Sequence, residues 1–333
     1  MIGWYVHHQG AGHLHRARAV QRVLDLPATV LSSLPRPEDW TGEWVQLERD
    51  DGDPAREPDA GGRLHWAPLH QRGLTTRMAQ ISAWLGSARP TLLVCDVSVE
   101  VCLLARLHGI PVLVVAMPGV RSDPAHLLGY DVATSVVGCW PVQARGLFES
   151  SPAVAGRLRL VGGLSRFSVV RPEPRRPGPP RVSVLLGTGG SDIDEVMIDQ
   201  ARTRSAGWDW TIMGRHVRQW HADPSESLRH ADVVITQAGQ NAVAEVAAAR
   251  RPAIVIPARR PHDEQLRTAA ALEQGPWPVS VRAEWPLQDW ASLLHTTAAL
   301  DGEAWASWCD GLAASRFAAI VEELAARFPD PSP

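Results

Sequence analysis

The N-terminal segment His8-Gln-Gly-Ala-Gly-His13 places an imidazole directly after a glycine-rich turn. The apolar run Ile2–Val6 precedes this turn and an Ala- and Arg-rich helical pattern over Arg16–Leu24 follows it, which is typical of a strand, turn and helix. An imidazole titrates near neutral pH, so His13 is a candidate general base. A helix cap or a purely structural histidine is the alternative interpretation of the same residue.

A carboxylate that follows another apolar run could orient this base. Asp96 comes directly after Leu92–Cys95, and ligand-facing residues of open α/β sheets gather at the carboxyl ends of strands. A carboxylate beside an imidazole fixes its tautomer and stabilises the imidazolium. Glu100 competes with Asp96 for this role, and Asp96 could instead cap the helix predicted over Ser98–Leu107.

The segment Ala231–Pro257 carries residues that suit a nucleotide. The apolar run Asp232–Thr236 leads to Gly239, where a helix is predicted to open. The unpaired N–H groups and the positive dipole at such a helix start bind phosphate. Glu245 lies near the second turn of the helix, where its carboxylate could accept hydrogen bonds from a ribose diol.

In order and spacing this segment resembles the donor-binding signature of GT-B glycosyltransferases, in the branch that contains MurG, the peptidoglycan N-acetylglucosaminyltransferase. The resemblance implies that Glu245 holds the ribose and that Asp263 and Gln265 address the donor sugar. Thr268 stands where the family has Asn, so that one contact is not expected here. The donor-binding residues that the resemblance implies are Gly187, Thr188, Gly189, His221, Gly239, Gln240, Asn241, Glu245, Asp263 and Gln265.

The acceptor is expected to lie on the N-terminal side of an interdomain cleft. Gly10 and Gly12 resemble the family's first glycine-rich loop, which faces that cleft. Arg121 and His126 lie in a loop after another predicted strand and would line the acceptor side, although a solvated loop explains them equally well.

The implied activity is transfer of a sugar from a nucleoside diphosphate sugar, with UDP favoured by resemblance alone, to an acceptor hydroxyl. His13 would deprotonate the acceptor, and one displacement would invert the anomeric centre. The acceptor could be lipid-linked, a glycan or a secondary metabolite. Two other functions stay open: a sugar-nucleotide epimerase of the same fold, and a non-catalytic subunit that binds a nucleotide sugar.

No metal site or cofactor is predicted, apart from the sugar nucleotide as cosubstrate. The pair Asp192-Ile-Asp194 matches D-x-D in letters, but it begins a predicted helix and suits the helix dipole better. The chain contains no Lys, which removes P-loop and Schiff-base chemistry, and its 4 Cys show no C-x-x-C spacing.

Net charge and hydropathy limit the partners and the location. A formal charge of −3 over 333 residues makes nucleic acid an unsuitable partner. No apolar run is long enough to span a membrane, so we expect a cytoplasmic protein, and a lipid-linked acceptor would add peripheral contact with the inner face of the membrane.

The elements that must position these residues follow a strand-turn-helix order twice, which predicts an α/β fold of two facing Rossmann-like domains. We expect an acceptor-side domain over 1–170, a Pro-rich linker over 171–181 and a donor domain over 182–333. The segment Arg36–Arg63 is expected to be irregular, and a final helix within Ala304–Phe328 is expected to pack back near the domain junction.

Overall fold

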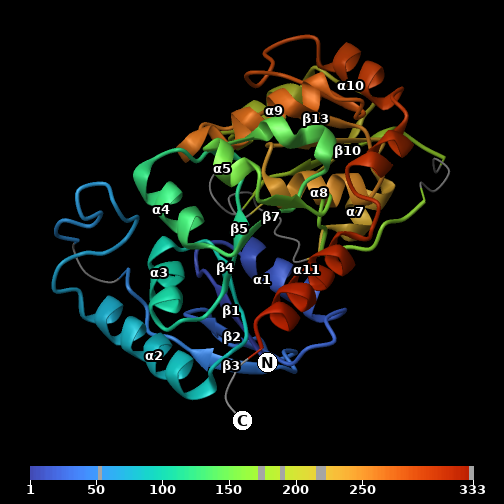
Figure 1. The fold of residues 1–333 in the computed structure, drawn as a ribbon. Coiled ribbons are helices and arrows are strands. Elements are labelled where there is room, and N and C mark those ends of the chain that lie inside the picture. The colour runs from blue at the N-terminus through green and yellow to red at the C-terminus, as the bar shows by residue number, and fades with distance from the viewer. Residues whose placement is uncertain (52–54, 172–176, 188–191, 215–222, 330–333) are drawn as a thin grey trace.

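The computed structural model describes residues 1–51, 55–171, 177–187, 192–214 and 223–329, and these ranges form two large parallel sheets flanked by helices, with a separate two-stranded sheet (Figure 1). The strands are β1 (Ile2–Val6), β2 (Ala28–Ser32), β3 (Glu43–Gln46), β4 (Leu93–Asp96), β5 (Val112–Ala116), β6 (Gly119–Val120), β7 (Ser135–Gly138), β8 (Phe148–Glu149), β9 (Leu158–Leu160), β10 (Arg181–Leu185), β11 (Asp209–Met213), β12 (Val233–Thr236), β13 (Ala253–Val255) and β14 (Val279–Val281). The helices are α1 (Gly12–Gln21), α2 (Arg72–Ala88), α3 (Val99–Leu107), α4 (Pro124–Val132), α5 (Pro152–Ala155), α6 (Glu195–Thr203), α7 (Ser225–His230), α8 (Gln240–Ala248), α9 (Glu264–Gln274), α10 (Trp290–Ala298) and α11 (Ala313–Arg327), with 3-10 turns η1 (Val142–Leu147), η2 (Pro261–Asp263) and η3 (Gly302–Ser307).

The first sheet has seven strands in the order β3-β2-β1-β4-β5-β7-β9. Every residue of β1 is buried, as expected for a central parallel strand that is covered on both faces. Because β2 and β4 flank β1, the chain leaves β1 toward one side and later returns on the other. The carboxyl ends of β1 and β4 therefore form a topological switch point, where open α/β sheets bind ligands.

The second sheet repeats this design with five parallel strands in the order β11-β10-β12-β13-β14. Its switch point lies between β10 and β12, which are paired from Val182↔Val233 to Leu185↔Thr236. The loops after these two strands are the ones that the sequence assigns to the donor.

Two features, the strand β3 and the helix starts, differ from the sequence-based expectation, and a third agrees with it. The segment Arg36–Arg63 is not wholly irregular, because Glu43–Gln46 forms β3 and pairs with β2 at the sheet edge. The N-terminal helix begins at Gly12, before Arg16, and the C-terminal helix begins at Ala313. The turn at Asp194 does cap a helix, since its side chain accepts a hydrogen bond from the Met197 amide at 2.8 Å.

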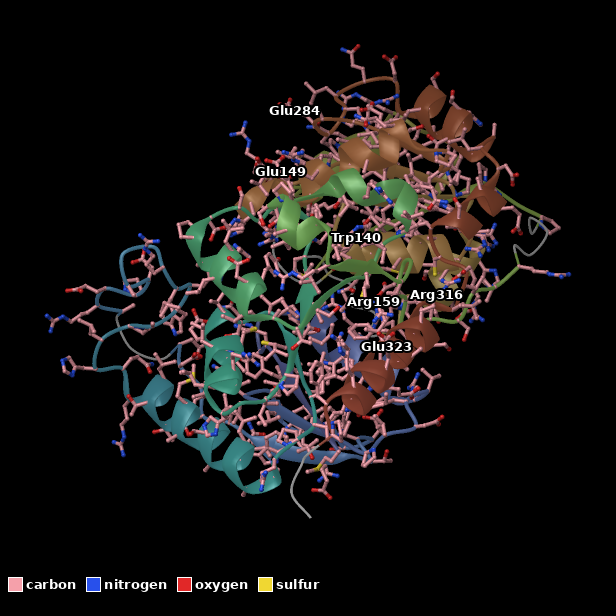
Figure 2. The ribbon with its side chains drawn as sticks, in the orientation of Figure 1. Trp140, Glu149, Arg159, Glu284, Arg316 and Glu323 are labelled. Carbon is pink, nitrogen blue, oxygen red and sulfur yellow. The ribbon has the colours of Figure 1, made fainter. Side chains whose placement is uncertain are left out.

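The final helix α11 packs against the first sheet, on the same face as α1 (Figure 1). Phe317 is fully buried, with its ring centroid 5.3 Å from that of Trp4 in β1. Figure 2 shows Glu323 on α11 beside Arg159 on β9, where their two hydrogen bonds measure 2.9 and 2.7 Å. The C-terminal segment therefore joins the core built by the N-terminal one, while the boundaries at 170 and 181 stay a prediction.

None of the helices in the described ranges is both long enough and apolar enough to cross a membrane.

Candidate active site

A cavity of about 410 Å³ lies where the two switch points face each other. This volume lies in the range of small-molecule sites. The predicted residues that line it are Gly10, Gly12, His13, Gly187, Gly239, Gln240, Asn241, Glu245 and Gln265. A wider depression of about 1260 Å³ beside Arg106 and Phe328 contains none of the predicted residues, so we place the site in the smaller cavity.

His13 and Asp96 meet at the switch point of the first sheet. The Nδ1 atom of His13 lies 2.9 Å from Oδ1 of Asp96, although the two residues are 83 positions apart in the chain. Because Nδ1 is engaged with the carboxylate, Nε2 is the nitrogen left to accept a proton. The side chain of His13 is 14% exposed, so it can reach a molecule bound in the cavity.

Arg16 completes this network and was not among the predicted site residues. Its guanidinium donates to Asp96 Oδ1 at 2.5 Å and to Gln240 Oε1 at 3.1 Å. Burial opposes the ionisation of Asp96, but Arg16 and His13 hold its pKa below the ordinary value. Asp96 is therefore a buried carboxylate anion, and Arg16 ties it to the helix that starts the donor site.

Asp96 and Glu100 make different contacts in the structure. Ser98 caps α3 by accepting from the Val101 amide at 3.2 Å, so Asp96 does not serve as that cap. Glu100 points elsewhere and accepts from the amides of His65 and Trp66 at 2.8 and 3.0 Å. Asp96 is the carboxylate beside His13.

The starts of α1 and α8 face each other across the cavity. Neither helix has a side-chain cap at its N-terminus, so backbone N–H groups stay available there. A Cβ on Gly12 would meet the terminal Nδ2 atom of the Asn241 side chain, which shows how closely the two helix starts approach each other here. Two positive helix ends thus converge on one cavity, and such ends favour a diphosphate.

Glu245 is buried one helical turn inside α8 and pairs with Arg166, whose Nε lies 2.8 Å from Oε1. Burial raises the pKa of Glu245, while Arg166 lowers it in part. Arg166 also lines the cavity and was missed in the sequence, where it stands as a single arginine ahead of the predicted linker.

The acidic residue next to Gln265 in the cavity is Glu264, not the predicted Asp263. Glu264 and Gln265 line the cavity, whereas Asp263 is exposed and has a left-handed backbone with φ 54°. Gln265 accepts from the Ala258 amide at 2.8 Å. The signal for Glu264 was its position directly before Gln265.

The remaining predicted residues have different outcomes. Arg121 and His126 lie together on the N-terminal side, with Nη1 of Arg121 3.2 Å from Nε2 of His126. Thr188, Gly189 and His221 lie outside the described residues.

Comparison with solved structures first identifies the fold class of the protein. Solved structures that match nearly the whole chain are the glycotransferase of kitacinnamycin (TM-score 0.65, 15% identity, 97% of this chain and 98% of that one), MurG of Acinetobacter baumannii (0.64, 15%, 97% and 99%) and the calicheamicin glycosyltransferase CalG4 (0.64, 16%, 99% and 99%). At these identities the match shows the fold, which is GT-B with two Rossmann-like domains, as predicted.

The family follows from the sequence matches. Residues 169–275 match the glycosyltransferase family 28 C-terminal domain. The chain is also 33% identical over 258 residues to the UDP-N-acetylglucosamine–N-acetylmuramyl-(pentapeptide) pyrophosphoryl-undecaprenol N-acetylglucosamine transferase of Sorangium cellulosum (strain So ce56), covering 68% of this chain and 62% of that protein. The chain thus spans less than two thirds of that relative's length. The C-terminal part of the chain thus matches glycosyltransferase family 28, and the chain is similar to a MurG-type transferase, which confirms the resemblance predicted from the Ala231–Pro257 motif.

Proposed function

We propose that this protein transfers a sugar from a nucleoside diphosphate sugar, with UDP as the favoured nucleotide, to an acceptor hydroxyl. One observation carries the proposal: the His13–Asp96 pair, with its 2.9 Å contact, opens into the same cavity as the uncapped start of α8 and the buried Glu245. A base and a site for a diphosphate and a ribose thus share one space.

The proposed transfer is a direct displacement. The acceptor hydroxyl gives its proton to Nε2 of His13 as its oxygen bonds to the anomeric carbon. The bond from that carbon to the diphosphate oxygen breaks, and its electron pair leaves with the nucleoside diphosphate. Asp96 stabilises the imidazolium that forms, and the anomeric centre is inverted.

We propose that this reaction uses no metal and no cofactor. The helix ends of α1 and α8 stabilise the charge that develops on the leaving diphosphate, and Arg166 adds a cation in the same cavity. Once the Arg166 side chain turns from Glu245 toward the phosphates, the Glu245 carboxylate accepts hydrogen bonds from the ribose hydroxyls.

The acceptor is proposed to enter past Arg121 and His126. A small, mostly apolar cavity of about 40 Å³ lies there, and Met117 lines both this cavity and the donor cavity. The relative from Sorangium cellulosum is named for a pyrophosphoryl-undecaprenol acceptor, so we propose a lipid-linked acceptor ahead of a glycan or a secondary metabolite. Such an acceptor implies a cytoplasmic protein in peripheral contact with the inner face of the membrane.

The test is calorimetric titration of the full chain with UDP, dTDP and GDP, followed by the same titration of Glu245→Gln. We expect one nucleotide to bind, and its binding to weaken by about 1–3 kcal/mol in the variant because charged hydrogen bonds to the ribose are lost. Glu273→Gln, on the exposed side of α9, is the matched control and should bind normally. An unchanged affinity in Glu245→Gln, or no binding to any nucleotide by the folded protein, contradicts the donor site.

The products separate this function from its alternatives. With a nucleotide sugar, release of free nucleoside diphosphate supports transfer or slow hydrolysis, whereas an epimerised sugar nucleotide would indicate the epimerase. Tight binding without turnover against a panel of acceptors would indicate the non-catalytic subunit.

A further inference from the structure

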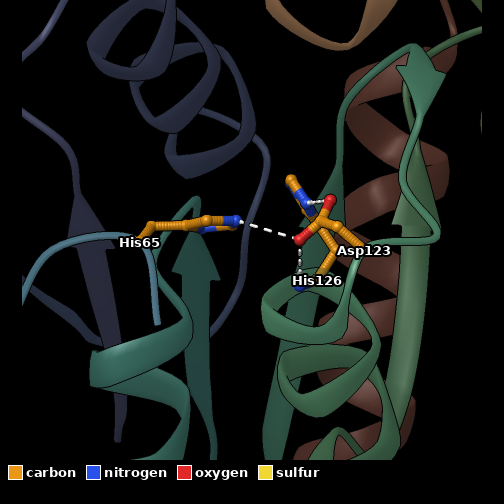
Figure 3. Close-up of side chains that lie close together, drawn as sticks. All are labelled: His65, Asp123 and His126. Carbon is orange, nitrogen blue, oxygen red and sulfur yellow. Dashed lines mark hydrogen bonds and ion pairs between the residues drawn. The ribbon is translucent and has the colours of Figure 1, made fainter. Parts of the chain in front are cut away.

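Three side chains from two parts of the chain converge on one point at the acceptor side of the cleft. They are His65 from the loop before α2, Asp123 at the cap of α4, and His126 in the first turn of α4. One possible ligand atom from each lies within 4.8 Å of the other two. Figure 3 shows both imidazoles directed at the Asp123 carboxylate, with His65 Nε2 at 3.5 Å and His126 Nδ1 at 2.5 Å.

A fourth side chain reaches the cluster from the other domain. His262 lies in η2, between β13 and α9, and its Nδ1 is 3.7 Å from Asp123 Oδ2. Its ring centroid lies 4.7 Å from that of His126. The backbone of His262 approaches β6 so closely that a Cβ on Gly119 would collide with its carbonyl oxygen. Three imidazoles, from both halves of the molecule, thus surround one carboxylate.

Neighbouring groups hold these ligand atoms in place. The Glu100 carboxylate accepts hydrogen bonds from the His65 and Trp66 amides, which fixes the loop that carries His65. His262 is hydrogen-bonded to the backbone of Val120. Asp123 accepts the His126 amide at 3.1 Å, so its carboxylate is anchored to the helix start. Metal-binding imidazoles are oriented in this way by groups behind them.

We propose that His65, Asp123, His126 and His262 bind a divalent cation of the zinc class. Three imidazole nitrogens and one carboxylate oxygen are a ligand set that suits tetrahedral Zn²⁺, and Co²⁺ or Ni²⁺ as its substitutes. Because one ligand comes from the donor domain, the ion clamps the acceptor loop to η2, next to Gln265. The ion takes no part in the transfer itself, and the inference does not depend on the proposed activity.

The cluster is open to solvent. The side chains of His65, Asp123 and His262 are 34%, 35% and 34% exposed, so an ion can enter from solvent.

Arg121 is the group that opposes the ion. It faces Nε2 of His126 at 3.2 Å, which places the imidazole proton on Nδ1, the atom that would bind the metal. On binding, the proton moves to Nε2 and Arg121 must turn away. The Glu264 carboxylate can then pair with the displaced Arg121 guanidinium, since Oε2 of Glu264 already lies 3.6 Å from Arg121 Nη2. Arg121→Gln removes the opposing charge and should tighten metal binding.

The experiment uses the full chain and the metals alone. Zn²⁺ affinity is measured by calorimetry and Co²⁺ binding by its visible absorption, whose intensity reports a tetrahedral site. We expect saturable binding at one ion per chain, weakened about tenfold or more by His126→Asn and by His262→Asn. Circular dichroism and thermal melting confirm that each variant is folded.

His70→Asn is the matched control for His262→Asn. Both histidines have left-handed backbones, with φ 58° and 61°, and Asn tolerates that conformation, so the two variants make the same change inside and outside the cluster. His70→Asn should bind metal like the unmodified protein. The proposal is overturned by the absence of saturable Zn²⁺ binding, or by binding that survives His262→Asn.

A second imidazole group gives a further check. His7 and His8 stack at 4.7 Å, and His7 lies 6.0 Å from His13. Metal binding that is lost in His8→Asn instead of His126→Asn would place the ion there and refute the clamp. Titration with UDP on the same variants reports on the donor site separately, so failure of one proposal leaves the other measurable.

Discussion

Asp96→Asn removes the negative charge that faces His13 while keeping the shape of the side chain. An imidazolium and a carboxylate about 4 Å apart attract each other by about 4 kcal/mol at an effective dielectric constant of about 20. Each 1.4 kcal/mol corresponds to about tenfold in rate, so the full loss would slow proton transfer by about a thousandfold. Arg16 shares the same Oδ1 atom and neutralises part of that charge. We therefore expect turnover to fall by about a hundredfold to a thousandfold.

The variant also leaves the guanidinium of Arg16, 2% exposed, without its anion. Breaking a buried ion pair costs about 3–5 kcal/mol of folding stability, so the rate must be measured where the variant is still folded. The assay is nucleoside diphosphate release from the donor that the calorimetry selects. The donor affinity should change much less than turnover, because Asp96 contacts His13 and Arg16 and is not itself a proposed donor-binding residue.

Asp50→Asn is the matched control for this experiment. Asp50 is buried in the same domain and pairs with the buried Arg77 at 2.6 Å, but it does not contact His13. We expect a similar loss of stability with little change in turnover. Equal losses of turnover in the two variants would refute the catalytic reasoning, and normal turnover in Asp96→Asn would show that the carboxylate does not assist the base.

Three further predictions concern the fold around the cavity. Gly12→Ala should destabilise the protein because the new methyl group meets the Asn241 side chain, and Asn241→Ala should relieve this contact. In a double-mutant cycle of unfolding free energies we expect a coupling of about 0.5–3 kcal/mol between the two positions. Additive effects would count against the contact. Burial, with neighbouring cations, lowers the pKa of His7 to about 3, so the stability that its neutral form contributes is complete above about pH 6.5 and falls by up to about 1.4 kcal/mol per pH unit on acidification. His7→Gln should flatten that slope in urea unfolding between pH 7 and 5, and an unchanged slope would contradict the assignment. Phe317→Ala should cost about 3–5 kcal/mol in the same assay, while Arg159→Gln, in an exposed pair with Glu323, should change the unfolding free energy far less. Similar costs would contradict the packing of α11.

The sequence predicted the parts of the site that depend on local order. His13, Gly239 and Glu245 each sit at a fixed spacing from an apolar strand run, and parallel strands bring their carboxyl ends to one edge of a sheet. Asp96 was predicted by the same rule. Its contact with His13 follows from the pairing of Val6 with Asp96 in neighbouring strands.

The residues that were missed depend on geometry that spacing does not record. Arg16 lies three positions after His13 on one helix, but its partners Asp96 and Gln240 are 80 and 224 positions away. Glu264 lies in the cavity in place of the predicted Asp263 because the backbones of His262 and Asp263 are left-handed. Non-glycine residues adopt that conformation rarely, so no sequence pattern indicates it.

The short strand β3 was missed for a different reason. Glu43–Gln46 has only Trp44 and Val45 as strand-favouring residues and sits at the edge of the sheet. Parallel pairing with β2, from Thr29↔Glu43 to Ser32↔Gln46, stabilises the strand, whereas its local β propensity is low. A four-residue edge strand is thus decided by its neighbour, and sequence periodicity over so few residues cannot predict it.

Two hydrogen bonds of Gln240 join the two domains at the proposed site. Gln240 accepts from Arg16 at 3.1 Å and donates to the Cys139 carbonyl at 3.3 Å, so the first residue of α8 is held by two segments of the N-terminal domain. Arg16 in turn holds Asp96, and Asp96 orients His13. Separation of the domains would break the Arg16–Gln240 and Gln240–Cys139 contacts, so we expect these contacts only when α8 faces His13.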